Sequence, residues 1–310
     1  MNQVSQDSED NVRTSPGNNN NKPSNMTGHG SNNADGSLST SGNGISSATA
    51  TAMISVAGTN SGPGKEPVNG HLDPSRRRVY LLVFSFSIVN AIIGLMLILV
   101  WMLNYRPVTG FGLSSAGQMA NLHPLLMYTF MVSLNMYSVL IYRTHYAQPK
   151  SQLKWTHAIL SGANILMSLL GVAAMFKAHL MSNQANFYSL HSWIGAATNT
   201  FYLIQFVAGA LAFLRPGWTT QAQRAKLMPW HRIAGTTILV LAALAAITGI
   251  AELVIFQDSK TAVYAKFAPI TYIANFAGVA IILMTASTVY LLAERAYLRP
   301  ALPEEAPLKR

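Results

Sequence analysis

The chain of 310 residues contains no cysteine, and only 10% of its residues are charged. The absence of cysteine excludes disulfides, iron–sulfur clusters and covalently attached c-type haem, whose attachment needs a C-x-x-C-H run. No P-loop is present and no glycine-rich dinucleotide fingerprint follows a strand-like segment, so nicotinamide and nucleotide chemistry are not supported. The chain also begins without the basic region and compact apolar core of a secretory signal.

Residues 1–74 are dominated by Asn, Ser, Gly and Thr. Such a segment cannot bury enough apolar surface to offset the entropy lost on ordering it. We predict a disordered cytosolic tail over 1–74, a membrane domain over 75–298 and a short cytosolic tail over 299–310.

Hydrophobic residues make up 50% of the chain and are concentrated in six long runs downstream of the tail. A membrane-crossing helix needs about 20 mainly apolar residues. Backbone polar groups find no water in the bilayer core, so these runs must be helical. We therefore predict an all-α integral membrane protein. Its six transmembrane helices are expected at 79–103, 121–142, 155–176, 187–214, 231–256 and 267–292.

Lysines and arginines predict the orientation, since short loops rich in them stay on the cytosolic side. One set of flanks holds ten of them, whereas the alternate loops hold only four, Arg106, Lys177, Lys260 and Lys266. With six spans, both termini are then expected in the cytosol. The net charge of +10 is interpreted as topology rather than nucleic-acid binding, because no basic soluble domain is present.

Four histidines, His123, His157, His191 and His231, stand near the starts of the second to fifth segments, at intervals of 34, 34 and 40 residues. Hydrocarbon offers imidazole nitrogens no partner, so such a residue lines a polar pathway or binds something. Consecutive segments run in opposite directions, which places His123 and His191 at the outer leaflet and the other two at the inner leaflet. Two histidines at each depth predict two haems, each clamped between imidazoles inside a central four-helix bundle.

Small and polar residues continue along the histidine-bearing faces of three segments. In the third segment the series is His157, Ser161, Asn164, Ser168 and Gly171, at helical steps of four and three. Small residues leave room for a flat ring, but membrane helices also use them to pack closely without any cofactor. On these residues alone, a histidine-lined proton or metal-ion transporter without haem is an equal alternative.

Local strings around the histidines resemble the cytochrome b561 family of ascorbate-dependent membrane oxidoreductases. They are Asn121-Leu-His123-Pro124, the pair Tyr142-Arg143, Lys154 three residues before His157, and Tyr188-Ser-Leu-His191-Ser192-Trp193-x-Gly195. The likeness covers essentially the whole membrane domain. It implies two haem b groups, the outer held by His123 and His191 and the inner by His157 and His231. One departure is Ser161, where many family members have another histidine.

The resemblance implies transmembrane electron transfer. Cytosolic ascorbate would reduce the inner haem, and the outer haem would pass the electron to ferric iron or monodehydroascorbate on the lumenal or extracellular side. The family also suggests a homodimer, with the first and sixth segments flanking the haem core. The expected membrane is the plasma membrane or an endomembrane such as a vesicle or lysosome.

Cations and a histidine are expected at the two mouths. Arg143 and Lys154 match family positions beside the inner haem, and Lys150 joins them on charge alone, because ascorbate is an anion at neutral pH. At the outer mouth, Lys177 and His179 are expected at the acceptor site, where His179 resembles a family histidine.

Other titratable residues receive less specific expectations. Glu252, near the outer end of the fifth segment, is expected to bond a neighbouring helix or to remain protonated. The loop 215–230, with Arg224 and Lys226, has no assigned role. Three further histidines are expected to be non-ligands: His29, His71 and His145.

Overall fold

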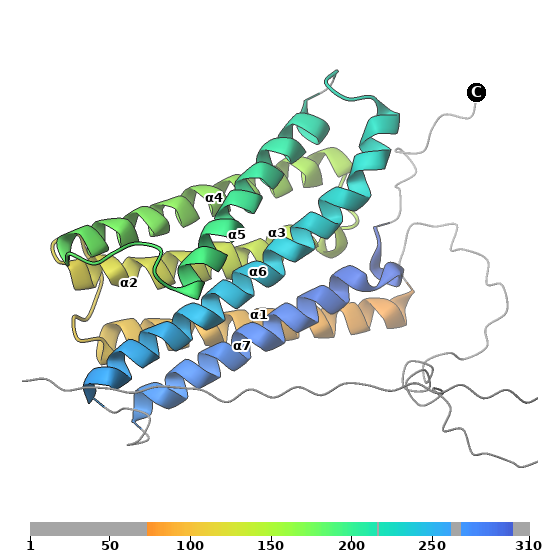
Figure 1. Cartoon of the computed structure of the whole chain (residues 1–310). Coiled ribbons are helices and arrows are strands. Elements are labelled where there is room, and N and C mark those ends of the chain that lie inside the picture. The colour runs from red at the N-terminus through yellow and green to blue at the C-terminus, as the bar shows by residue number, and fades with distance from the viewer. Residues whose placement is uncertain (1–72, 216, 262–267, 300–310) are drawn as a thin grey trace, which may run out of the picture. The chain divides into compact units, whose positions relative to one another are not determined.

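A computed structural model describes residues 73–215, 217–261 and 268–299, and these residues are helical in all six places where a span was predicted (Figure 1). Six helical segments are long and apolar enough to cross a membrane: Pro74–Tyr105, Ala116–Thr144, Lys150–Met181, Leu190–Leu214, Gln221–Phe256 and Pro269–Ala293. The predicted all-α class and multi-pass membrane character are confirmed. The two predicted tails lie outside the described residues, except for 73–74 and Arg299.

Several spans combine α-helix with π-helix. Helix α1 (Pro74–Val100) continues into η1 (Trp101–Tyr105), and the second span runs through α2 (Ala116–Leu126), η2 (Met127–Leu134) and α3 (Asn135–Thr144). The remaining elements are α4 (Lys150–Met181), α5 (Leu190–Gly209) with η3 (Ala210–Leu214), α6 (Gln221–Thr261), α7 (Pro269–Ala293) and the short 3-10 turn η4 (Arg295–Tyr297).

Capping side chains mark the starts of two helices, which differ from the starts of the predicted apolar runs. The Ser115 side chain accepts from the Gln118 amide at the start of α2, and Ser189 and Ser192 form a reciprocal capping box at the start of α5. The expected loop 215–230 is shorter than predicted, since α6 begins at Gln221 and contains Pro229. The residues before Pro229 are largely exposed, so water can bond the carbonyl that proline leaves without a donor.

Four spans form a closed ring of neighbours. The second span packs against the third, the third against the fourth, the fourth against the fifth, and the fifth, through α6, against η2 and α3 of the second (Figure 1). The second and fourth spans therefore stand at opposite corners of a four-helix bundle, as do the third and fifth. This arrangement is the predicted central bundle.

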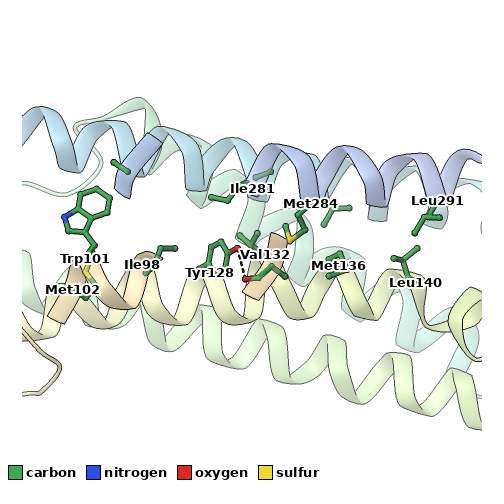
Figure 2. Packing of buried hydrophobic residues seen from close by; sticks show 14 of the residues in the cluster. Ile98, Trp101, Met102, Tyr128, Val132, Met136, Leu140, Ile281, Met284 and Leu291 are labelled. Carbon is green, nitrogen blue, oxygen red and sulfur yellow. Dashed lines mark hydrogen bonds between the residues drawn. The ribbon is translucent and has the colours of Figure 1, made fainter. Parts of the chain in front are cut away.

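Helices α1 and α7 pack against each other and cover one side of the bundle. Figure 2 shows Trp101, Tyr128, Met284 and other buried side chains filling the space between α1, the second span and α7. The Tyr128 hydroxyl donates to the Ala91 carbonyl at 3.0 Å, and the Ser87 and Ser287 hydroxyls meet at 2.7 Å. These two contacts satisfy polar groups across helices, as the bilayer favours, whereas the buried Trp101 indole nitrogen has no hydrogen-bond partner in the described part of the chain.

Large apolar side chains also point away from the bundle. Leu82 is 70% exposed on α1, Ile159 66% on α4 and Phe276 61% on α7. In water such surfaces would be costly, whereas lipid tails cover them without penalty.

Gly94 of α1 lies against Tyr128, and a Cβ at this position would overlap the phenol group. We expect Gly94→Ala to lower the thermal midpoint of the detergent-solubilised protein, with an overpacking cost of about 1–3 kcal/mol. Gly278→Ala on α7 is the control, because a Cβ there meets no atom within 4 Å. Alanine favours helix over glycine by up to about 1 kcal/mol, so the control should be neutral or stabilising. Equal midpoints for the two variants would contradict the packing described here.

Candidate functional site

His123 and His191, the pair predicted for the outer leaflet (the outer pair), join opposite corners of the bundle. His123 comes from α2 and His191 from the first turn of α5, and their ring centroids lie 5.8 Å apart with the ring planes at 88°. Neither helix supplies both residues, so the pair exists only because the second and fourth spans face each other.

The inner pair joins the other two corners. His157 of α4 and His231 of α6 have ring centroids 6.2 Å apart, with the planes at 79°. The structure thus brings together the same two pairs that span direction predicted.

Main-chain carbonyls hold three of the four rings. His123 Nδ1 lies 3.1 Å from the Gly171 oxygen, His157 Nδ1 2.9 Å from the Ser138 oxygen, and His191 Nδ1 2.8 Å from the Ala245 oxygen. A carbonyl only accepts hydrogen bonds, so each Nδ1 must carry the proton. In the neutral ring Nε2 then has a free lone pair, which is the form that binds a metal.

His231 is anchored differently. Its Nδ1 lies 2.9 Å from Nε2 of Gln205, and the same amide nitrogen donates to the His231 carbonyl at 2.7 Å. A side-chain amide therefore takes the place that a carbonyl occupies at the other three rings. A metal-bound His231 would need an acceptor at Nδ1, which Gln205 supplies if its amide turns its oxygen toward the ring.

The two pairs lie at well-separated levels of the bundle. Along α4, His157 stands at the inner level and Gly171, the acceptor for His123, at the outer level, fourteen residues further on. His231 and Ala245 have the same separation along α6. At a rise of 1.5 Å per residue, the levels are about 21 Å apart.

The spacing within each pair fits a metal between the rings. A metal–nitrogen bond of about 2 Å on each side, plus the half-width of each ring, gives a centroid separation of roughly 6 Å. Within the described residues, no cluster of three or more His, Cys, Asp or Glu side chains could hold a metal ion. A metal bound by two imidazoles would therefore take its other ligands from elsewhere, as iron does in a porphyrin.

A cavity of 1020 Å³ surrounds the outer pair. His123, His191, Gly195 and Thr198 line it together with mainly apolar side chains. A Cβ at Gly195, one turn beyond His191, would meet no atom within 4 Å. The space beside the ring is thus open, and it suits a flat, largely apolar macrocycle.

The two residues expected at the outer mouth differ in exposure, since His179 is buried and Lys177 is exposed. His179 is 8% exposed and lines the outer cavity, with Nδ1 2.8 Å from Oδ1 of Asn186. Its Nε2 is buried without a hydrogen-bond partner within the described residues. Lys177, two residues earlier, is exposed to the surroundings.

Glu252 lies beside Tyr188, which precedes α5. Burial, together with the neighbouring Glu252 carboxylate, raises the pKa of the Tyr188 hydroxyl. Tyr188 is thus one neighbour of the carboxylate, whose Oε2 has no hydrogen-bond partner in the described part of the chain.

At the inner end, two of the expected cations bond helix ends. Arg143 donates to the carbonyls of Leu291, Leu292 and Glu294 at 2.6–2.7 Å, and so caps α7. Lys154 donates to the Phe213 carbonyl at 3.0 Å in η3. Lys150 is exposed at the start of α4. The substrate role predicted for these three residues stays a prediction.

The remaining candidates lie apart from the pairs. Arg224, in the first turn of α6, donates to the Thr219 carbonyl at 2.5 Å in the preceding loop, while Lys226 is exposed. His145 pairs with the Tyr137 hydroxyl at 2.7 Å, and His29 and His71 lie outside the described residues.

Sequence reasoning missed one cavity residue and the anchors of the rings. Arg106 was counted only as a loop cation, yet it lines the outer cavity and bonds Asn121. Its position directly after the first span was the available signal. The carbonyl anchors cannot be recognised from residue identity, because every residue has a main-chain carbonyl.

Comparisons with known proteins agree on one family. The family model described as eukaryotic cytochrome b561 matches residues 122–257. A protein of Oryza sativa subsp. japonica named probable ascorbate-specific transmembrane electron transporter 2 is 31% identical over 199 residues, 64% of this chain and 83% of the relative. The lysosomal membrane ascorbate-dependent ferrireductase of Danio rerio is 31% identical, over 71% of this chain and 91% of the relative. The plasma membrane ascorbate-dependent reductase of Xenopus laevis is 30% identical, over 71% and 77%.

A substitution at Gly249 of α6 tests whether the outer pair needs the present position of the His191 ring. A Cβ there would lie 2.7 Å from Cε1 and 2.8 Å from Nδ1 of His191, so Gly249→Ala should push the ring off its axis. We expect the haem content of the purified protein to fall by about half, because only one of the two pairs is disturbed. Gly278→Ala should leave the haem content unchanged. Full haem loading of Gly249→Ala would show that the His191 ring does not need its present position.

Proposed function

The chain belongs to the cytochrome b561 family, and from that premise we propose that it carries electrons across a membrane from cytosolic ascorbate to ferric iron or monodehydroascorbate. The observation that carries this proposal is the presence of two opposed histidine pairs at two levels of one four-helix bundle. Each pair would hold one haem b, which supplies a carrier that gains and loses a single electron.

The anchoring of the rings supports haem over an ion pathway. A histidine that relays protons must exchange them at both ring nitrogens, whereas a carbonyl at Nδ1 retains one proton there. Three rings of this chain are held in that way. Fixed rings with one free nitrogen are suited to a metal that stays in place.

The inner mouth supplies positive charge for an anionic donor. Lys150 is exposed, while Arg143 and Lys154 bond main-chain carbonyls that define the inner ends of two spans. An ascorbate anion would meet the Lys150 ammonium first, and would share the donors of the two other side chains with those carbonyls.

The outer mouth supplies a proton for the reduced acceptor. Monodehydroascorbate takes up a proton when it is reduced, and His179 has an unpartnered Nε2 in the same cavity as the outer pair. The Asn186 oxygen holds its other nitrogen. The imidazolium form of His179 would give its Nε2 proton to the acceptor and keep its Nδ1 proton on the Asn186 oxygen, while Lys177 would attract the anion from outside.

The wider organisation belongs to the same proposal. Both termini face the cytosol, and the membrane domain forms a homodimer in the plasma membrane or in a lysosomal or vesicular membrane. Relatives named for the lysosomal membrane and for the plasma membrane support both locations.

Electron delivery across sealed vesicles tests the function. Vesicles that contain the protein and enclose ascorbate should reduce a ferric chelate or monodehydroascorbate radical outside, each acceptor being tried separately. Vesicles without protein give the leak rate. If haem-loaded protein delivers no electrons above that rate, the proposed electron transfer is refuted.

Substitution of a proposed haem ligand tests which histidines hold which of the two haems. His123→Gly should remove the outer haem and about half of the b-type absorbance, leaving an inner haem that ascorbate still reduces. Added imidazole should restore the missing absorbance, because it can occupy the space of the lost ring. His145→Ala is the control and should keep the full spectrum. Retention of both haems in His123→Gly would refute its role as ligand.

A further inference from the structure

Arg106 places a cation in the wall of the outer cavity. It is half-buried and is the only lysine or arginine among the residues that line this cavity. Burial lowers the pKa of its guanidinium, which indicates that the surroundings stabilise the charge poorly. A cation in such a setting is costly unless an anion or several acceptors accompany it.

The guanidinium is held by a buried amide. Nε of Arg106 donates to Oδ1 of Asn121 at 2.9 Å, and Asn121 is fully buried. The Asn121 amide nitrogen donates in turn to the carbonyls of Val108 and Gly110, both at 2.8 Å. This network ties the loop after the first span to α2, two residues before His123. The position of the arginine is therefore built into the fold.

No carboxylate of the described chain neutralises this cation. Among the residues that line the cavity, the only acidic one is Glu252, and it lies beside Tyr188. No ion pair joins Arg106 to a carboxylate within residues 73–215, 217–261 and 268–299, and Nε is the one guanidinium nitrogen there with a hydrogen bond to the protein. Four of the five N–H donors stay available for a ligand.

His179 provides a second unsatisfied group in the same cavity. Its Nε2 is buried without a partner, and the side chain is more than nine-tenths buried. A guanidinium without a carboxylate partner and a buried imidazole nitrogen without any hydrogen-bond partner indicate that the cavity takes a ligand with anionic oxygen atoms.

We propose that Arg106 is the anion-binding residue of the outer site and pairs with a carboxylate. A guanidinium offers parallel N–H donors that match the two oxygens of a carboxylate. Two sources carry this group, a propionate of the outer haem and a soluble acceptor such as ferric citrate. The inference rests on the proposed function, since it assumes a haem and an acceptor at this end of the bundle.

The test measures reoxidation of the haem-loaded protein after reduction with dithionite, so that it does not depend on ascorbate. Stopped-flow rates are recorded with ferric citrate, an anion, and with hexaammineruthenium(III), a cation, each of which takes up one electron. Redox titration gives the midpoint potentials of both haems. Arg106→Gln is compared with wild type and with Arg295→Gln, which removes the same charge from an exposed position at the inner end.

The two sources give different results. If Arg106 binds the soluble anion, Arg106→Gln raises the half-saturating ferric citrate concentration by about tenfold and leaves the ruthenium reaction and both potentials unchanged. If it binds the propionate, the potential of the outer haem alone falls, because a positive charge that favours the reduced form is lost. Arg295→Gln changes none of these quantities.

Arg106→Lys keeps the test decisive if the glutamine variant loses haem. Lysine retains the charge but has no planar pair of donors, so it should show the same change to a smaller degree. Unchanged potentials and an unchanged ratio of the two reoxidation rates in a folded variant would overturn the proposal and leave Arg106 as a brace for the loop. Failure of wild type to accept electrons from ascorbate would instead count against the proposed function alone.

Discussion

Hydrocarbon offers no hydrogen-bond partner to an imidazole, and the rest of the structure depends on how the four half-buried rings meet this constraint. Each ring bonds to the neighbouring span of its own hairpin, three of them through a main-chain carbonyl. In those three the carbonyl satisfies Nδ1, sets the plane of the ring and leaves Nε2 for a metal. One interaction thus stabilises helix packing and prepares the site.

The bundle repeats this device in two hairpins. In the hairpin of the second and third spans, His123 bonds the Gly171 carbonyl and His157 bonds the Ser138 carbonyl. In the next hairpin, His191 bonds the Ala245 carbonyl. Each hairpin is therefore braced at both levels. The fourth brace differs, because Gln205 contacts His231 through a side chain. The inner site is thus the one whose anchor a substitution can change directly.

Hydropathy located the spans well and their ends poorly. It detects the part of a helix inside hydrocarbon, whereas capping by Ser115 and Ser189 sets where α2 and α5 begin. The same limit applies to cations. The charge bias identified Arg143 and Lys154 as residues of the inner end, but their bonds to the carbonyl ends of other helices depend on which helices are adjacent.

The sequence by itself determined the six helices and their alternating directions, because length and hydropathy act along the chain. It therefore also predicted which histidines share a level. The tertiary structure alone decided that the second and fourth spans face each other across the bundle, which carbonyl holds each ring, and that Arg106 reaches the outer cavity. Those features are contacts between residues far apart in sequence, and the packing of whole helices selects them.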